Sequence, residues 1–138
     1  MDLKFPMEFL VFGTPVSLQA KRPATRDAWK ALVREASKAA LPENHFASDA
    51  SVAVTLLYFP SEPMQGDIDN IVKPILDAFC QYIYLDDRQV ERLVVQKFEP
   101  ERTVTFVAPT QRLTEALVAE RPVLYIRISD TPLEDAAR

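Results

Sequence analysis

The segment formed by residues 51–59 constrains the fold most, because apolar side chains fill it almost without interruption. It is rich in β-branched and aromatic residues, which favour strands. A strand with apolar side chains on both sides of its backbone is typical of a sheet that is covered on both faces. Pro60 and Pro63 follow closely and end the segment. The sequence therefore predicts a buried strand at this position.

Hydrophobic periodicity predicts the other elements. We expect further strands at residues 7–12, 90–98, 103–108 and 123–128, of which the middle two should form a hairpin. We expect helices at residues 25–39, from near residue 72 onward, and at residues 110–119. Pro74 sets the start of the second helix, because a proline costs about 3 kcal/mol in a helix interior but little in the first turn.

The 138 residues have the length of one domain. The order of the elements predicts an α/β (α+β) fold, a single domain in which helices pack on one mixed β-sheet. We assign residues 1–128 to this domain and expect residues 129–138 to form a loose polar tail.

Rare residues exclude several kinds of chemistry. The two glycines, Gly13 and Gly66, are too few for the glycine-rich loops that hold nucleotide phosphates, and we expect no organic cofactor. Cys80 is the single cysteine and His45 the single histidine, which excludes an intrachain disulfide, a cysteine-based zinc cluster and a site with several histidines. Any catalytic chemistry must therefore use carboxylates, basic side chains and hydroxyls.

No segment reaches the roughly 18 consecutive apolar residues of a membrane span, and the first residues do not resemble a signal peptide. We therefore expect a cytoplasmic protein without a membrane partner.

The net charge of −4 at first argues against a nucleic-acid partner, but the charges are unevenly distributed. Residues 67–91 contain six acidic and two basic side chains, which accounts for the whole negative excess. Residues 21–38 contain six basic and two acidic side chains.

Basic residues recur every four positions along the first predicted helix. Because successive members turn about 40° around the helix axis, they form a slanting stripe that could follow a phosphate backbone. A solvated helix face is the alternative explanation. The residues that we expect to bind DNA are Lys21, Arg22, Arg26, Lys30 and Arg34, and Lys38 continues the spacing.

The most informative acidic segment runs from Gly66 to Lys73. Asp67 and Asp69 flank one residue, and side chains two positions apart in extended backbone point the same way. Carboxylate oxygens are the ligands that Mg²⁺ prefers, and Lys73 lies one helical turn beyond Asp69. A helix cap within a solvated loop is the alternative explanation for this pair of acids.

A second acidic pair, Asp86 and Asp87, follows the second predicted helix. One reversal of the chain would bring this pair back toward the first. Because adjacent side chains of an extended chain point to opposite sides, we expect one of the two to reach the same ion. The other is expected to cap a helix or to pair with Arg88.

Together, these segments resemble the RusA family of Holliday junction resolvases. The family pattern is a D-x-D-N-x-x-K helix start, a further Asp one turn later, and a D-D-x-Q-V segment. The matching residues are Asp67, Asp69, Asn70, Lys73, Asp77, Asp86, Asp87, Gln89 and Val90. The segments Phe12-Gly13-Thr14-Pro15-Val16-Ser17 and Lys21-Arg22-Pro23 also resemble the N-terminal part of the family, and the resemblance spans roughly residues 8–98.

The resemblance implies a RusA-like fold and a dimer. It places the catalytic and metal-binding acids on Asp67, Asp69 and Asp87, and the essential lysine on Lys73. It also implies a Mg²⁺-dependent endonuclease, with Mn²⁺ able to substitute, that resolves four-way DNA junctions by paired symmetric nicks in recombination and repair.

Two other functions remain open at this stage. One is a less selective nuclease for branched or flap DNA that uses the same carboxylates. The other is a junction-binding protein without catalytic activity.

Apolar residues on two strands could contribute to a dimer interface, although an ordinary core would also explain them. These residues are Leu56, Tyr58, Leu93 and Val95.

Overall fold

A computed structural model describes residues 2–17 and 22–136. These residues form one domain built on a mixed sheet of four strands in the order β1-β4-β2-β3. The strands are β1 (Met7–Val11), β2 (Val52–Phe59), β3 (Val90–Lys97) and β4 (Val123–Ser129). The pair β2–β3 is parallel, whereas β4 runs antiparallel to both β1 and β2. The predicted fold class is confirmed.

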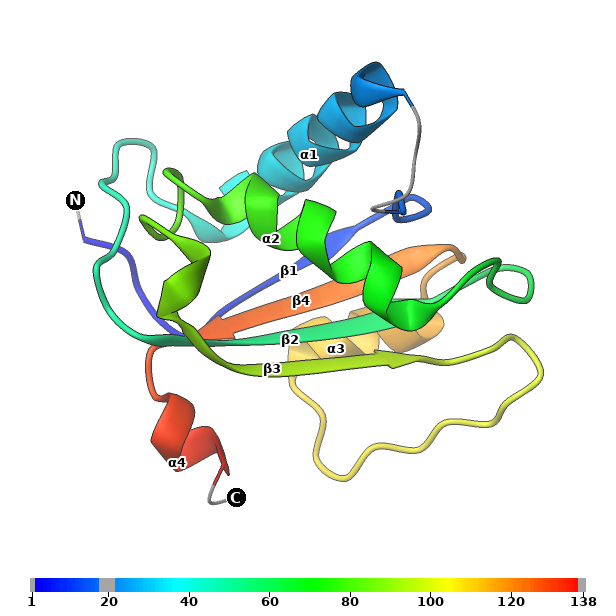
Figure 1. Cartoon of the computed structure of the whole chain (residues 1–138). Coiled ribbons are helices and arrows are strands. Elements are labelled where there is room, and N and C mark those ends of the chain that lie inside the picture. Colours follow the sequence, from blue (N-terminus) through cyan, green and yellow to red (C-terminus); the bar gives the residue numbers. More distant parts are fainter. Residues whose placement is uncertain (1, 18–21, 137–138) are drawn as a thin grey trace.

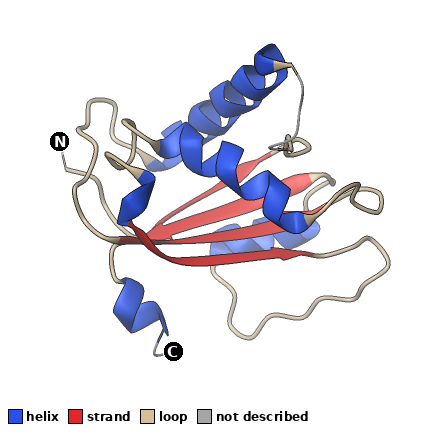
Figure 2. Cartoon of the chain, viewed as in Figure 1, coloured by secondary structure: helices blue, strands red, loops and turns tan. Residues whose placement is uncertain are grey.

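Helices cover both faces of this sheet (Figures 1 and 2). The helices α1 (Pro23–Ser37) and α2 (Val72–Phe79) lie on one face, and α3 (Gln111–Val118) lies on the other. Successive residues of β2 point to opposite faces of the sheet. Leu56 belongs to the apolar cluster under α1 and α2, and Leu57 belongs to the cluster under α3. The prediction that β2 is buried on both faces is therefore correct.

Helix α2 begins at Val72, as the position of Pro74 predicted. The short 3₁₀ helix η2 (Ile68–Ile71) precedes it directly. Pro74 is the third residue of α2, so its missing N–H group falls in the first turn, where N–H groups have no partner within the helix. Another 3₁₀ turn, η1 (Lys38–Ala40), extends α1 to about the predicted end.

The predicted hairpin is wrong. Residues 103–108 form no strand, and β3 is an edge strand that pairs with β2. Instead, Val104 and Phe106 pack against the apolar cluster under α3, and the rings of Phe98 and Phe106 lie 5.6 Å apart. The alternation of apolar residues in this segment therefore reflects contacts with the core rather than pairing with a strand.

The C-terminal segment is also more ordered than we predicted. Strand β4 continues through Ser129, which is buried, and Pro132–Ala136 form the short helix α4. Arg127 of β4 pairs with Asp135 at 3.4 Å, which ties α4 to the sheet. Residues 129–136 thus contain the end of β4 and a short helix, and the domain boundary at residue 128 stays a prediction.

Within the described residues, no helix has the length and apolar character needed to cross a membrane.

Tyr84 stabilises the turn that follows α2. Its side chain is buried, and its hydroxyl donates a hydrogen bond to the carbonyl oxygen of Leu76 at 2.9 Å. Burial raises the pKa of Tyr84 well above its ordinary value. In the unfolded chain this hydroxyl ionises near pH 10, whereas in the folded protein it stays neutral to higher pH. Its contribution to the free energy of unfolding is therefore complete below about pH 10 and is lost as the pH rises further.

Replacing this hydroxyl should destabilise the fold. We expect Tyr84→Phe to lower the free energy of unfolding by about 1–2 kcal/mol at neutral pH, because the Leu76 carbonyl loses its partner. Between about pH 10 and pH 11 the wild-type protein should lose about 1 kcal/mol more stability than the variant. Urea unfolding at both pH values measures both effects. An equal pH dependence in the two proteins would contradict the role of this hydroxyl.

Candidate active site

Lys73 lies at the centre of the acidic residues that the fold brings together. It belongs to the first turn of α2, and its Nζ atom lies 3.0 Å from Oδ1 of Asp77, one turn further along the same helix. The same ammonium group donates a hydrogen bond to Oδ2 of Asp87. Asp87 is the first residue of the 3₁₀ helix η3 (Asp87–Gln89), which leads into β3. One cation thus joins carboxylates from two elements.

The chain reversal between α2 and η3 is held by hydrogen bonds. Gln89 accepts from the N–H groups of Leu85 and Asp86 at 2.9 and 3.0 Å. Its amide nitrogen donates to the carbonyl oxygens of Ser48 and Ala50, both at 2.8 Å. Gln89 therefore anchors the acidic turn to the segment that enters β2. We had assigned no role to Gln89, although a capping-box spacing from Asp86 could have indicated one.

The two neighbouring acids of this turn make different contacts. Asp86 is the N-cap of η3, and its Oδ1 atom accepts a hydrogen bond from the N–H group of Arg88 at 2.8 Å. Its carboxylate also pairs with the Arg88 guanidinium at 3.3 Å. The backbone N–H of Arg88 lowers the pKa of Asp86. The carboxylate of Asp86 is thus engaged by Arg88, whereas the carboxylate of Asp87 contacts Lys73.

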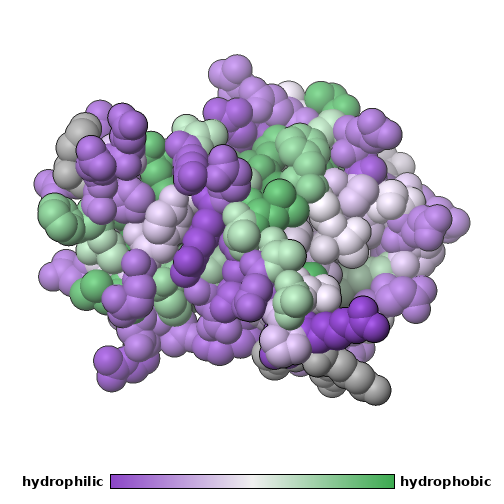
Figure 3. Space-filling view, turned by 90° about the horizontal axis from the view of Figure 1, so that it is seen from above, coloured by the Kyte–Doolittle hydropathy of each residue, from purple (hydrophilic) through white to green (hydrophobic). Residues whose placement is uncertain are grey.

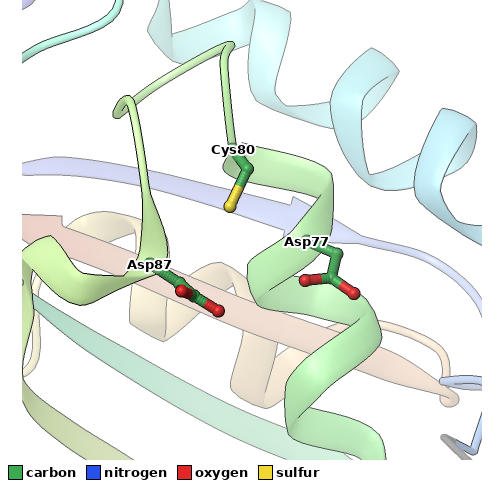
Figure 4. Close-up of side chains that lie close together, drawn as sticks. All are labelled: Asp77, Cys80 and Asp87. Atoms are coloured by element: carbon green, nitrogen blue, oxygen red, sulfur yellow. The ribbon is translucent and has the colours of Figure 1, made fainter.

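The cluster contains hard donor atoms and one thiol. Single atoms of Asp77, Cys80 and Asp87 lie within 4.8 Å of one another, and Figure 4 shows the three side chains directed toward a shared space. Burial, followed by the charge of Asp87, raises the pKa of the Cys80 thiol, which is therefore protonated at neutral pH. Carboxylate oxygens are the remaining donors, and they suit a hard cation such as Mg²⁺.

Lys73 balances these acids electrostatically. The hydrogen bond with Asp87 and then the one with Asp77 raise the pKa of Lys73 well above its ordinary value. Its ammonium group is therefore fully charged at neutral pH. Asp77 matched the family pattern, but we assigned it no role, although its i, i+4 spacing from Lys73 is a recognised sign of a helical ion pair.

The first acidic pair adopts a different backbone from the one that we expected. Asp67 is extended, with φ −93° and ψ 147°, whereas Asp69 lies within the 3₁₀ helix η2. The argument from a continuous extended chain therefore does not hold. Both side chains are exposed, and within the described residues neither forms an ion pair. Asp69 precedes Lys73 by four residues, but the backbone between them changes from the 3₁₀ helix η2 to the α-helix α2.

Asp67 also lines a cavity of about 330 Å³ beside η2. Thr14 and Pro15, from the turn after β1, also line this cavity. Gly13 allows that turn to lie close to α1, because a Cβ atom there would be 3.2 Å from Leu32 and 3.3 Å from Trp29. The two glycine-containing motifs of the sequence, around Gly13 and Gly66, thus meet at one cavity.

The predicted basic stripe lies on α1, on the same face of the sheet as α2 (Figure 1). Arg22 is exposed, and Arg26 and Lys30 are half-buried. Arg34 has a structural role as well, because its Nε atom donates to the carbonyl oxygen of Ala78 at 2.7 Å, near the end of α2. Lys21 lies outside the described residues. Figure 3 views this side of the molecule and shows hydrophilic residues surrounding a smaller apolar area.

A family model described as Endodeoxyribonuclease RusA matches residues 13–108. The chain belongs to the RusA family. The match includes the turn after β1, the basic helix α1 and every proposed residue of the acidic site. Membership identifies an endodeoxyribonuclease of a family that is metal-dependent, binds branched DNA and resolves Holliday junctions. No individual curated protein matches the chain significantly.

Proposed function

We propose that this RusA-family protein hydrolyses phosphodiester bonds of four-way DNA junctions in a Mg²⁺-dependent reaction. The observation that carries this proposal is the placement of Lys73 between Asp77 and Asp87, at the start of the helix that follows Asp67 and Asp69. Lys73 thus links an acid of the helix motif, Asp77, to an acid of the second acidic pair, Asp87.

The donor set fits a hard cation, and we assign Asp67, Asp69 and Asp87 to hold it, with Mn²⁺ able to substitute. A bound Mg²⁺ would lower the pKa of a water molecule and stabilise the charge that develops on the phosphate. Lys73 offers a positive charge to the same oxygens. Asp77, 3.0 Å from the ammonium group, is a second partner of Lys73 besides Asp87.

A homodimer would supply the paired symmetric nicks that resolution of a junction requires, since a four-way junction has two-fold symmetry. Leu56 and Tyr58 are buried in the core, so they do not offer a surface to a second copy. Leu93, on the edge strand β3, is 41% exposed and remains a candidate contact. Light scattering measures the oligomeric state, and a monomer at the concentration used for cleavage would contradict paired nicking by a dimer.

The basic face of α1 should bind the DNA backbone. We expect charge reversal at Arg22, Arg26 and Lys30 to weaken junction binding about tenfold to a hundredfold at moderate salt, because phosphate contacts are lost. Arg34 is left intact, since its contact with Ala78 supports the packing of α1 on α2. Fluorescence anisotropy at several salt concentrations measures the affinity. Unchanged affinity would identify the stripe as a solvated helix face.

The function is tested by cleavage of a four-way junction, a fork, a flap and a linear duplex, each with and without Mg²⁺. We expect Mg²⁺-dependent, symmetrically paired nicks in the junction and little cleavage of the duplex. Comparable cleavage of forks and flaps would favour the less selective nuclease. Binding of the junction without nicking at any Mg²⁺ or Mn²⁺ concentration would favour the non-catalytic binder and overturn the proposal.

A further inference from the structure

The cavity beside η2 lies next to the proposed site of hydrolysis. Its walls come from the turn after β1, the end of β2, residues 61–67 and the end of η2. Asp67 belongs both to this wall and to the proposed metal ligands. A group that enters the cavity is therefore adjacent to the phosphate that the site would cleave. Its volume of about 330 Å³ is within the range of small-molecule pockets.

The lining favours a flat, uncharged ligand over a phosphate. Among the described residues that line the cavity, the charged side chains are Glu62 and Asp67, and both are acidic. Buried Pro15, Pro60 and Ile71 provide apolar walls. A negatively charged phosphate group would be repelled by the two acids, whereas a nucleobase brings no charge.

Polar groups that could read the edge of a base are also present. The lining includes the hydroxyls of Thr14 and Tyr58 and the amide of Asn70. Tyr58 is buried, and a hydrogen bond links its hydroxyl to Thr14. An amide presents a donor and an acceptor side by side, which matches the hydrogen-bonding edge of a base.

Contacts from outside the cavity hold its walls in place. The N–H group of Met64 donates to Oε2 of Glu99 at 3.2 Å, and Glu99 is itself paired with Lys97. Arg121 donates to the carbonyl oxygen of Pro60 at 3.3 Å. Gly66, the last residue before Asp67, has φ +77°, a backbone conformation that residues with side chains rarely adopt. The cavity is thus formed before any ligand binds.

We propose that this cavity binds an unstacked nucleobase of the nucleotide next to the scissile phosphate. This inference rests on the proposed function, because it places the cleaved strand at Asp67. Unstacking a base costs least where pairing is already weakened, as at the branch point of a junction. The base would anchor the strand, and the polar groups of the cavity would favour some bases over others.

The experiment fills the cavity with a bulky side chain and measures whether the nucleobase still unstacks. Ser61 is exposed at the rim, so Ser61→Trp should fold normally while its indole occupies the cavity. Val118→Trp places the same side chain on α3, on the opposite face of the sheet, and is the matched control. Both are made in the Asp87→Asn background, so that the junction is bound without being cut.

The probe is a four-way junction with 2-aminopurine next to the scissile phosphate, since the fluorescence of this base rises when it unstacks. We expect fluorescence to rise about twofold or more on binding to Asp87→Asn and to Asp87→Asn/Val118→Trp. With Ser61→Trp added, the rise should be lost at saturating protein. No rise in the Asp87→Asn protein, or an equal rise with Ser61→Trp, would overturn the proposal.

A second measurement uses the active protein and four junctions that differ in the base at this position. We expect cleavage rates to differ by about tenfold or more between the best and worst base. In Tyr58→Phe, which removes one polar group of the cavity, this ratio should fall, and in Ser61→Trp it should fall to about twofold. Equal rates with all four bases in the wild-type protein would overturn the proposal. Failure of the wild-type protein to cut any junction would overturn the proposed function, whereas cleavage at equal rates for all four bases would overturn only this inference.

Discussion

Asp87→Asn is expected to lower the rate of junction cleavage by about a thousandfold or more. The reason is that the substitution removes a charged oxygen ligand from the proposed metal site, where a bound cation contributes several kcal/mol to stabilisation of the transition state. Asn keeps the shape of the side chain, and Asp87 is partly exposed, so the fold should persist. Single-turnover cleavage at saturating protein measures the rate, and anisotropy measures binding of the uncut junction.

Asp86→Asn is the matched control for this prediction. Asp86 neighbours Asp87, but its carboxylate caps η3 and pairs with Arg88. Because Asn caps helices about as well as Asp, the cleavage rate of Asp86→Asn should stay within about threefold of the wild-type rate. Mg²⁺ should raise the melting temperature of the wild-type protein and of Asp86→Asn more than that of Asp87→Asn. Wild-type cleavage by Asp87→Asn would contradict the assigned site.

Lys73→Met should reduce the cleavage rate by about a hundredfold to a thousandfold. The substitution removes the positive charge that faces the phosphate, and removal of one electrostatic group of this kind typically costs about 3–4 kcal/mol. Lys73→Arg should recover part of the activity, because it retains the charge with a different geometry. Cleavage rates are measured over a range of Mg²⁺ concentrations. If the variant only binds Mg²⁺ more weakly, high Mg²⁺ restores the rate; if it lacks the lysine charge at the phosphate, the rate stays low.

The loss of Lys73 should also change stability. Without the ammonium group, Asp77 and Asp87 face each other with no cation between them, and Mg²⁺ should stabilise Lys73→Met more than the wild-type protein. Arg112→Met removes a cation from α3 on the opposite face of the sheet and serves as the control. Cleavage by Lys73→Met at the wild-type rate would show that this lysine has no catalytic role.

Several local features of the candidate site follow from the sequence because they depend on residue types at short, fixed separations. The start of α2 at Val72 follows from the backbone of Pro74 alone. The division of roles between Asp86 and Asp87 follows from the alternation of neighbouring side chains. The ion pair between Lys73 and Asp77 follows from helical periodicity.

Other features depend on contacts between distant segments. The amphipathic pattern of residues 103–108 fits both a strand and a loop packed on the core, and only the position of the α3 cluster selects the loop. Arg34 has the spacing of a DNA-binding residue, yet the packing of α1 on α2 directs its Nε atom to Ala78. The role of Gln89 depends on the carbonyl groups of residues 48 and 50, which lie about forty residues earlier in the chain.

The sequence by itself determined the buried central strand, the limited choice of catalytic groups and the motifs of the RusA family. These are local properties, since they depend on composition and on spacing within single elements. The tertiary structure decided that Lys73 lies between Asp77 and Asp87, and that the turn after β1 and Asp67 line one cavity. The first arrangement requires the parallel crossover from β2 through α2 to β3, which places Asp87 near the start of β2, whereas the cavity lies where β2 ends.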